Sequence, residues 1–349
     1  MKITLQIISF FLIFAGLLPL IKRDYWTFRV FDYPRMQKLT LTLTIIFIWL
    51  SVFYNQLEIF DLAIVSALVI LAMYLFWQIF PFTPFSKKMI KDAKGNDPLA
   101  IKVFVSNVYQ YNTDFKKTTS LIEKENPDVF LLVETDQKWA DAIEIFKEEY
   151  PYHIEKPLDN TYGMLFYSKL PIKKEQLLYL IDDEIPSLEL DLELRDGNLI
   201  KIYAIHPTPP VPGENTTSTE RDAEILIVGK KAKAYGKPCL VIGDLNDVGW
   251  SYTSELFLKI SGLLDPRRGR GMFSTFHAKY FFLRWPLDHI FVSKEFTLRN
   301  ITVHKGIGSD HFPISTSLVL NPANLNEEKS ANATEKKEAK EKISDGKEA

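Results

Sequence analysis

Residues 241–247 of this 349-residue chain read Val-Ile-Gly-Asp-Leu-Asn-Asp, and the interpretation of the whole sequence starts from this stretch. The apolar run 239–242 predicts a buried strand that stops at Gly243. Asp244 and Asn246 follow at once, and active sites of layered α/β folds collect where strands end and loops begin. An ordinary turn rich in Asp and Asn would give the same local pattern. The argument for a site therefore depends on the other strand ends.

The composition excludes several classes of protein. The net charge is −2 with 25% charged residues, so the chain lacks the overall basic character of a nucleic-acid binder. Cys239 is the one cysteine of the sequence, so it cannot form an internal disulfide, and we expect it to be a small core residue. The length suits one large domain or two ordinary ones. The apolar residues are unevenly distributed, and their distribution divides the chain into four segments.

Residues 1–85 are predicted to form a transmembrane segment of about three helices. Apolar runs occupy residues 3–21, 39–54 and 62–80, and a helix of ~20 apolar residues crosses a hydrocarbon core of ~30 Å. A signal peptide is the competing interpretation of the first run, but no small-residue cleavage site follows it and further runs do. Two spans plus a surface helix is the alternative for the whole segment.

The distribution of Lys and Arg predicts the orientation in the membrane. Residues 22–38 hold five of them and residues 87–94 hold four, whereas the opposite side of a three-span arrangement has only Lys2. We therefore expect a multi-pass cell-membrane protein with its N-terminus outside and its large C-terminal region in the cytoplasm. Losing one span would invert this orientation. Because we expect no buried charges in the spans, a transporter or channel is disfavoured.

The remaining three segments are a linker, a catalytic domain and a tail. Residues 86–98 read as a charged linker, and in residues 99–320 short apolar strands alternate with amphipathic helices. We expect strands at 101–105, 128–133, 162–167, 188–194, 199–205, 239–242, 287–292, 296–303 and 311–318, and helices at 115–125, 137–149 and 219–235. Residues 321–349 are rich in Lys, Glu, Ala and Asn, so we expect a disordered tail.

Polar residues that a fold does not require lie at the ends of five of these strands. They are Asn107, Glu134, His206, Asp244 with Asn246, and Asp310 with His311, and a further pair, Asp288-His289, lies at the start of another strand. Carboxylate and amide oxygens suit Mg²⁺ or Mn²⁺, whereas zinc would favour Cys pairs or spaced His pairs, which the sequence lacks. A His beside an Asp suits acid–base catalysis or stabilisation of a phosphate. Together these are the parts of metal-assisted phosphoester hydrolysis.

The order of these motifs resembles the endonuclease/exonuclease/phosphatase superfamily, which includes deoxyribonucleases, apurinic endonucleases, neutral sphingomyelinases and inositol-polyphosphate 5-phosphatases. The resemblance covers about residues 99–320 and is carried by Gly-Asp-Leu-Asn at 243–246 together with Ser-Asp-His at 309–311. It implies a four-layer α/β sandwich, in which two mixed β-sheets pack face to face with helices outside.

The resemblance also implies a role for each residue. Glu134 would be the principal Mg²⁺ (or Mn²⁺) ligand, and Asn107 and Asp310 would complete or support the metal site. His311 would be the catalytic histidine, as general base or as a hydrogen-bond donor to the phosphate, and Asp288 would orient it.

Three further residues receive roles in the same way. Asp244 would position or deprotonate the attacking water, Asn246 would bind the phosphate, and His206 would be a second phosphate-contacting histidine. In the deoxyribonuclease branch an acid on the strand equivalent to 162–167 pairs with that histidine, and this sequence has no acid there. His289 alternates to the other face of its strand, so we expect it to be structural.

The local basic cluster at residues 267–273 has two interpretations. It and the aromatic stretch 276–285 could bind phosphate and form a lipid- or base-facing wall. The cluster could equally be a solvated loop that precedes core aromatics.

The sequence predicts a membrane-anchored, metal-dependent phosphoester hydrolase. Its substrate would be a nucleic acid, a lipid headgroup or a lipid-linked phosphate, and the spans favour the lipids because little basic surface is available to track a nucleic-acid backbone. No protein partner is predicted. The alternative, from a different class, is a non-catalytic membrane-tethered scaffold. Substitution at the motif positions would indicate it, and none is substituted.

Overall fold

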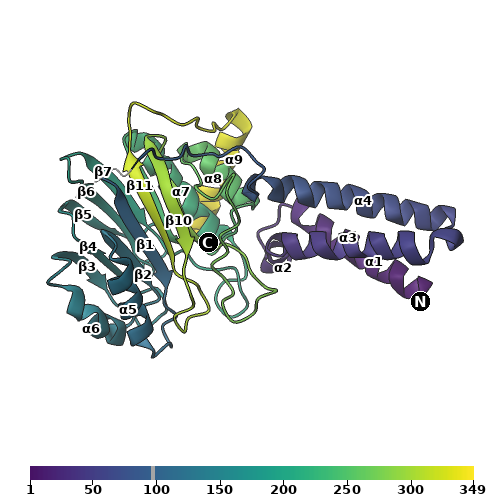
Figure 1. Ribbon diagram of the computed structural model, residues 1–349, viewed down its shortest axis with the longest axis horizontal. Helices are drawn as coiled ribbons and strands as arrows, with labels where there is room; N and C mark the ends of the chain where they lie inside the picture. The colour runs from purple at the N-terminus through teal and green to yellow at the C-terminus, as the bar shows by residue number, and fades with distance from the viewer. Residues whose placement is uncertain (96–98) are drawn as a thin grey trace.

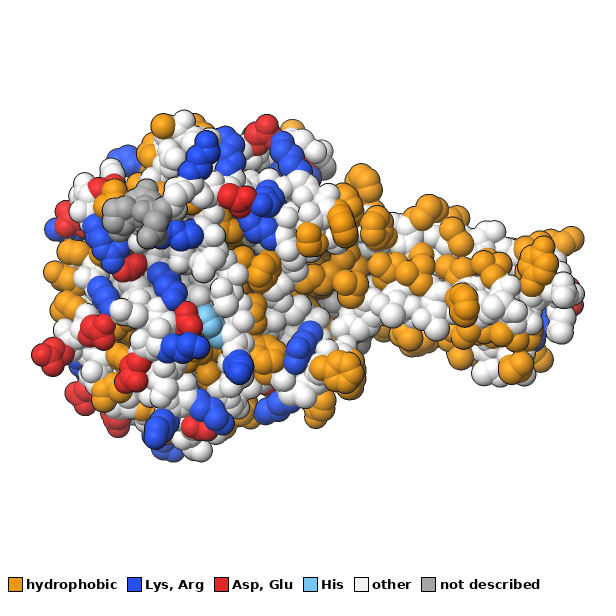
Figure 2. Space-filling model, viewed as in Figure 1, with side chains coloured by type: hydrophobic (Ala, Val, Ile, Leu, Met, Phe, Trp, Pro, Cys, Tyr) orange, Lys and Arg blue, Asp and Glu red, His pale blue; other side chains and the backbone are white. Residues whose placement is uncertain are grey.

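The computed structural model describes residues 1–95 and 99–349 and shows a two-sheet domain from which a bundle of helices projects (Figure 1). The projecting helices are α1 (Lys2–Leu17), α3 (Arg35–Val52) and α4 (Ile59–Ile79), with the short α2 (Trp26–Arg29) near the domain. Within the described residues, three segments are long and apolar enough to cross a membrane, namely Lys2–Leu20, Arg35–Val52 and Ile59–Phe82. Figure 2 shows that the projection is covered mainly by hydrophobic side chains, whereas the domain carries most of the charges.

Three charged side chains near the ends of these helices are buried, contrary to the expectation for the spans; one is Arg35, which begins α3 and pairs with Asp32 at 2.6 Å, and the other two lie further into the helices. Asp61, in the first turn of α4, pairs with Lys2 at 2.7 Å. Lys38, in the first turn of α3, donates to the carbonyl oxygens of Ala15 and Phe31. Asp61 and Lys38 are each compensated by a neighbouring helix end and Arg35 by Asp32, so none of the three marks a path across the bundle.

The domain is built on two mixed sheets, with six and five strands among the described residues. The first sheet has the order β10 (Phe296–Val303), β11 (Ile314–Leu320), β1 (Ile101–Asn107), β2 (Val129–Val133), β4 (Met164–Ser168) and β3 (Tyr152–Lys156). The second has the order β5 (Ile172–Leu178), β6 (Ser187–Glu193), β7 (Leu199–Ala204), β8 (Cys239–Asp244) and β9 (Asp288–Val292). The pairs β1–β2 and β7–β8 are parallel.

Helices cover the outer faces of both sheets, and the main core lies between the sheets. Val105 and Leu131 of the first sheet belong to the same buried cluster as Ile202, Leu240 and Ile290 of the second. The helices α5 (Phe115–Glu125) and α6 (Gln137–Ile143) pack on the first sheet, and α7 (Thr219–Tyr235) and α8 (Tyr252–Ser261) pack on the second. The four-layer α/β sandwich expected from the sequence is therefore confirmed.

The strand directions gather the candidate residues at one edge of the sandwich. The parallel strands β1 and β2 end together, with Asn107 opposite Val133. In the second sheet Asp244, at the end of β8, pairs with Asp288 at the start of β9. Since β9 and β11 run antiparallel to their neighbours, the starts of these two strands lie at the same edge as the ends of the others.

The prediction of a disordered C-terminal tail is wrong for residues 333–348. They form α9 (Ala333–Glu348), which begins with a capping box between Asn332 and Glu335 and packs on α7. Ala339 is fully buried, and Gly346 lies so close to Ala223 that an added Cβ would clash. Small residues make much of this contact, and Ile343 is the one large apolar side chain of the helix that packs there. The segment thus has almost no large apolar residues, and this scarcity led to the disorder prediction.

The segment expected to be a linker is partly built into the domain. Ile90 is fully buried in the core between the sheets, and Leu298 of β10 donates to the carbonyl oxygen of Lys91. Residues 96–98 of the expected linker lie outside the described residues. The helix expected at 137–149 ends at Ile143, followed by the 3₁₀ turn Glu144–Phe146.

Candidate active site

Four strand ends meet where the two sheets face each other. Asn107 is the last residue of β1, Glu134 follows β2, Asp244 ends β8 and Asp288 begins β9. The Asn107 Nδ2 donates to Glu134 Oε1 at 2.6 Å and to Asp244 Oδ2 at 3.0 Å. The Asn107 side chain therefore ties the first sheet to the second across the candidate site.

His311 lies between two carboxylates, just before β11 rather than in the strand as expected. Its Nδ1 is 2.8 Å from Asp288 Oδ2, and its Nε2 is 3.5 Å from Asp244 Oδ2. Ser309 fixes the loop, because its hydroxyl donates to the backbone oxygen of Asn107 and accepts from the His311 N–H, each at 2.9 Å. The imidazole is thus held with one nitrogen on Asp288 and the other directed into the site.

The two carboxylates determine the protonation of His311. Burial alone would lower the pKa of the imidazole, but the charges of Asp288 and Asp244 outweigh burial and raise it to about 10. The pKa of Asp244 is lowered, since the nearby His311 and His206 rings and the Asn107 amide more than offset the burial that would raise it. The arrangement favours an imidazolium at His311 beside an ionised Asp244.

Glu134 is a half-buried carboxylate in an unusual backbone conformation. Its φ of 59° lies in the left-handed region, which a glutamate seldom adopts and which occurs most often at functional sites. Burial, with Asp244 and Asp310 nearby, raises its pKa to about 7, although the hydrogen bond from Asn107 opposes this shift. A carboxylate at this place is destabilised unless a cation joins it.

The donor set fits a hard divalent cation. Oxygen ligands of Asp244 and Asp288 and a nitrogen of His311 lie within 4.8 Å of one another. Asp288 Oδ2 is bonded to His311 Nδ1, but Asp288 Oδ1 has no partner among the described residues, and Glu134 Oε1 already accepts a hydrogen bond from Asn107. Asp244, Asp288 and His311 are thus one candidate position for the cation, and Glu134 with the half-buried Asp310 is a second.

The amide of Asn107 faces the carboxylates with its nitrogen. Its Oδ1 accepts a hydrogen bond from the Tyr109 N–H at 3.0 Å, which orients Nδ2 toward Glu134 and Asp244. In this orientation Asn107 holds the carboxylates in place. The resemblance allowed Asn107 either to complete the metal site or to support it, and this geometry is that of a supporting residue.

Asn246 sits on a tight turn after β8. Its φ is 51°, its N–H donates to Asp244 Oδ1 at 3.0 Å, and its Nδ2 donates to the carbonyl oxygen of Pro207 at 3.0 Å. The turn orients the Asp244 carboxylate and leaves the Asn246 amide half-buried beside it.

Two residues that the sequence analysis missed hold the Asn246 backbone. The Tyr33 hydroxyl donates to the Asn246 carbonyl oxygen at 2.8 Å, and Arg221 Nη1 donates to the same oxygen at 2.7 Å. Arg221 comes from α7, and Tyr33 comes from the segment between α2 and α3. No motif pointed to Tyr33, because it lies far away in the sequence, between two apolar runs. The helical segment thus contributes directly to the loop that carries Asp244 and Asn246.

Removing the Tyr33 hydroxyl should loosen this loop. In Tyr33→Phe the ring is retained and Arg221 still binds the carbonyl, so we expect kcat to fall by roughly threefold to tenfold with KM nearly unchanged, the size of one net hydrogen bond. Steady-state kinetics with a soluble phosphodiester would measure the effect. Tyr25→Phe is the matched control, since no hydrogen bond of the Tyr25 hydroxyl is found in the described structure. Equal kinetics for the two variants would remove Tyr33 from the site.

His206 enters the site as a neutral residue. Burial lowers its pKa to about 4, and its Nε2 is 3.9 Å from Asp244 Oδ2. Among the described residues its Nδ1 has no hydrogen-bond partner. Where the deoxyribonuclease branch has an acid, the Tyr162 ring packs on the imidazole at 5.3 Å, and the Tyr162 hydroxyl donates to Glu214. The acid missing from the sequence is therefore replaced by an aromatic contact.

His289 has the structural role expected for it. Its Nδ1 lies 2.6 Å from Arg267 Nη2, and its Nε2 lies 2.8 Å from the Asp247 carbonyl oxygen. Arg267 is itself 2% exposed and pairs with Asp265 at 2.8 Å. The ring links the basic segment to the loop after β8.

Neither interpretation of the basic cluster holds. Arg268 is 4% exposed and pairs with Glu255, and Arg270 pairs with Asp92 at 2.6 Å. Like Arg267, these side chains bind carboxylates of the protein itself, so the cluster is not a solvated loop and presents no free cations to a phosphate in the candidate active site.

The aromatic stretch after this cluster divides into a packed part and an exposed part. Phe276 packs on Trp285 and on His311, with ring centroids 5.8 and 5.0 Å apart. Between them the chain forms an exposed tip, in which the relative exposures are 51% for Tyr280, 79% for Phe281 and 56% for Phe282. We call residues 280–282 the aromatic tip.

Comparison with known proteins agrees with this geometry. The sequence model of the Endonuclease/Exonuclease/phosphatase family matches residues 105–311, which is more than half of the chain. A comparison with curated proteins found no match.

Several solved structures share the fold. An endonuclease/exonuclease/phosphatase from Beutenbergia cavernae is 16% identical with a TM-score of 0.52, covering 64% of this chain and 72% of that one. TDP2 of D. rerio, complexed with a single-strand DNA product, is 16% identical with a TM-score of 0.54, covering 64% and 100%. A mannosyl-6-phosphatase of Bacteroides thetaiotaomicron is 18% identical with a TM-score of 0.50, covering 63% and 99%.

At such identities the solved structures establish the fold alone, whereas the match of the family model extends from β1 to His311 and includes all the candidate residues. The chain belongs to the endonuclease/exonuclease/phosphatase family, whose members generally hydrolyse phosphoester bonds.

Proposed function

We propose that the protein is a membrane-anchored, divalent-metal-dependent phosphoester hydrolase acting on phosphate groups at the membrane surface. The observation that carries the proposal is the single cluster in which Asn107 bonds both Glu134 and Asp244 while His311 is held between Asp244 and Asp288. A non-catalytic scaffold would have no reason to bury this many charges at one point. Residues 1–85 would be the anchor, and residues 99–320 with α9 the catalytic unit.

The side chains form two groups with different proposed roles in hydrolysis, and the first group binds the metal. Mg²⁺ or Mn²⁺, held by Glu134 and Asp310, would supply a Lewis acid for a phosphoryl oxygen. Asn107 keeps the Glu134 carboxylate in position by its hydrogen bond of 2.6 Å. The metal-binding group thus comes from the first sheet and from the loop before β11.

The second group positions the attacking water and stabilises the negative charge that develops on the phosphate. The ionised Asp244, oriented by the Asn246 N–H, accepts a hydrogen bond from the attacking water and aligns it. His311 donates from Nε2 to a phosphoryl oxygen, because Asp288 occupies its Nδ1 and both carboxylates favour the imidazolium. Of the two roles open for His311, this geometry supports the donor. The neutral His206 would be a second donor, since its Nε2 lies 3.9 Å from the same Asp244 Oδ2 that the His311 Nε2 approaches.

The aromatic tip supports a substrate in the membrane. The Gln37 side chain, in the first turn of α3, donates to the Phe282 carbonyl oxygen at 2.8 Å, so the tip lies beside the start of a candidate span. The same loop reaches the site, since the Ala278 N–H donates to the Asp310 carbonyl oxygen at 2.6 Å. One loop therefore joins the site to the level at which the headgroups of a bilayer would lie.

The basic cluster at residues 267–270 gives no support to a nucleic-acid substrate. Binding a nucleic-acid backbone needs several free Lys or Arg side chains, and the basic cluster at 267–270 is bound to acids of the protein. We therefore propose a phospholipid headgroup or a lipid-linked phosphate as the substrate class, approached from the cytoplasmic side that the Lys and Arg distribution predicts.

Phe281→Ser should lower the activity on lipid substrates but not the activity on soluble substrates. Removing a large apolar side chain from the membrane should lower kcat/KM by about tenfold on sphingomyelin or phosphoinositide micelles, whichever is cleaved, and leave a soluble phosphodiester unaffected. Ile145→Ser is the matched control, because Ile145 is also exposed, at 63%, but lies on the outer face of the first sheet. Equal losses in both variants, or equal losses on both substrates, would contradict the lipid proposal.

A further inference from the structure

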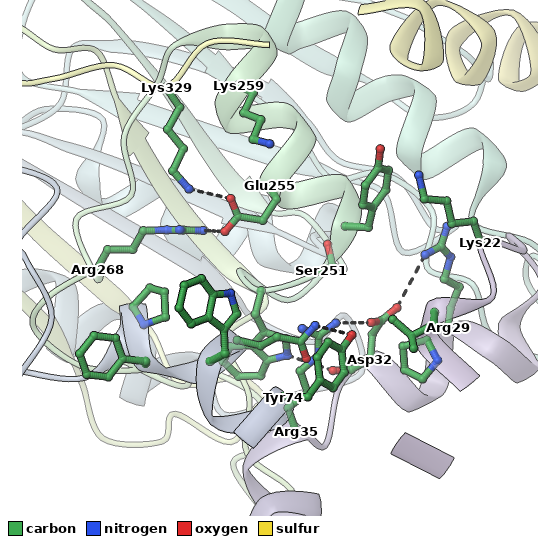
Figure 3. A pocket seen from close by; sticks show the side chains of 18 residues that line it. Lys22, Arg29, Asp32, Arg35, Tyr74, Ser251, Glu255, Lys259, Arg268 and Lys329 are labelled. Carbon is green, nitrogen blue, oxygen red and sulfur yellow. Dashed lines mark hydrogen bonds and ion pairs between the residues drawn. The ribbon is translucent and has the colours of Figure 1, made fainter. Parts of the chain in front are cut away.

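A second hollow lies between the helical projection and the domain, away from the candidate active site. Its volume is about 680 Å³, within the range of ligand sites, and none of the candidate site residues lines it (Figure 3). Leu20 and Trp77 contribute from the domain-side ends of two candidate spans, and Trp250 and Glu255 contribute from the domain. The hollow therefore lies where a span would leave the bilayer.

The lining is strongly cationic. Among the described residues that line it, the basic ones are Lys22, Arg29, Arg35, Lys259, Arg268 and Lys329, and the acidic ones are Asp32 and Glu255. Figure 3 shows that each of these two acids is shared, Glu255 by Arg268 and Lys329 and Asp32 by Arg29 and Arg35. The two remaining lysines pair with acids of α9, Lys22 with Glu338 and Lys259 with Glu335. Arg29 also pairs with Asp24 at 2.6 Å and lies 3.6 Å from Asp222. The basic residues of the lining therefore outnumber its acids, although each of them has an acidic neighbour.

The lysines remain accessible while the arginines are buried with unused donors. The side chains of Lys22, Lys259 and Lys329 are 58%, 34% and 36% exposed. Arg29 and Arg268 are each 5% exposed in their side chains, and in the described structure their Nε–H groups have no hydrogen-bond partner. Buried donors nearly always have a hydrogen-bond partner. The two unpaired Nε–H groups therefore indicate that the lining lacks an acceptor, which a ligand would supply.

The rim of the hollow has the composition of a membrane interface. Trp77 is 79% exposed, and Tyr74 lies one turn before it on the same helix. Aromatic residues with a polar tip collect at the headgroup level of bilayers, and basic pockets beside membrane helices bind anionic headgroups. A ligand here would place its charge among the lysines and its acyl chains along α4.

We propose that this hollow binds the headgroup of an anionic phospholipid, at a site distinct from the catalytic cluster. The inference rests on the membrane location in the proposed function and is independent of the proposed chemistry. The shared chemistry is a phosphate monoanion, which a lipid headgroup or a soluble phosphate could supply, and the exposed aromatic rim favours the lipid.

Native mass spectrometry of the full chain in nanodiscs tests the proposal. Discs of phosphatidylcholine with one fifth phosphatidylglycerol, prepared with EDTA to prevent hydrolysis, would show which lipid stays bound. We expect the unmodified protein to retain phosphatidylglycerol in preference to phosphatidylcholine. Lys259→Gln combined with Lys329→Gln should reduce this preference by roughly tenfold or more, since each basic residue near an anionic surface contributes severalfold.

The matched control is Lys173→Gln combined with Lys117→Gln. These lysines are also exposed and ion-paired, with Glu193 and Asp114, but lie in β5 and α5 and do not line the hollow. The control should keep the full preference, and both variants should cleave a soluble phosphodiester normally, which shows that they are folded.

Three outcomes would overturn the inference. They are equal retention of both lipids by the unmodified protein, an unchanged preference in the Lys259 and Lys329 variant, and displacement of the lipid by millimolar glycerol phosphate, which would indicate a soluble ligand. Failure of the protein to enter discs would contradict the membrane location as well, whereas an inactive protein that still selects phosphatidylglycerol would contradict the proposed chemistry alone.

Discussion

His311→Ala is expected to lower kcat by about two to four orders of magnitude, or ~3–5 kcal/mol in activation free energy, with the fold intact. The imidazole is the one group that joins both carboxylates of the second sheet, at 2.8 Å from Asp288 and 3.5 Å from Asp244. Alanine removes the donor to the phosphate and leaves the two acids facing each other. Stopped assays at saturating substrate, with circular dichroism for folding, would measure the effect.

Replacing a histidine outside the site with alanine provides the control for His311→Ala. His153 lies in β3 and stacks on Tyr167, with no contact to the candidate residues. His153→Ala should therefore keep nearly normal activity. Near-normal activity of His311→Ala would remove the proposed role of this histidine and of Asp288, which acts through it.

Glu134→Gln is expected to have the second large effect, on the metal. The substitution keeps the shape of the side chain but removes the charge that attracts a cation, so the apparent affinity for Mg²⁺ should fall by a hundredfold or more. Titrating Mg²⁺ against activity, and against the temperature of unfolding, gives two independent readings. Only the titration against activity depends on catalysis, whereas the temperature of unfolding reports metal binding directly.

A glutamate outside the site serves as the control for this experiment. Glu184 is exposed in the loop before β6, and Glu184→Gln should leave both titrations unchanged. An unchanged metal titration in Glu134→Gln would move the metal to another group, of which Asp244, Asp288 and His311 are the geometric alternative.

The sandwich and the grouping of the polar residues could be predicted because strand periodicity and strand ends are local signals. The runs before Glu134 and after Lys237 are apolar throughout, and β2 and β8 are indeed buried along their whole length. Where such central strands end, a charged residue has no structural purpose. This is why Glu134 and Asp244 could be singled out without a structure.

The parts that could not be predicted depend on contacts between distant segments. Tyr33 and Asn246 are separated by 213 residues, and nothing around Tyr33 resembles a motif. Arg268 reads as a free cation in the sequence and is buried against Glu255 in the fold. The helix α9 packs mainly through Ala339 and Gly346, and Ile343 is the one large apolar residue that adds to the contact, so the sequence carries little apolar signal there.

The central claim is metal-dependent phosphoester hydrolysis at the membrane. The most direct test incubates the full-length protein, in Mg²⁺ or in EDTA, with sphingomyelin, a phosphoinositide, a lipid pyrophosphate, and single- and double-stranded DNA. The account predicts cleavage of a lipid phosphate in Mg²⁺ and none in EDTA or with His311→Ala. Cleavage of DNA alone would contradict the lipid assignment, and absence of any cleavage while Mg²⁺ binds would contradict the enzyme itself in favour of a membrane-tethered scaffold.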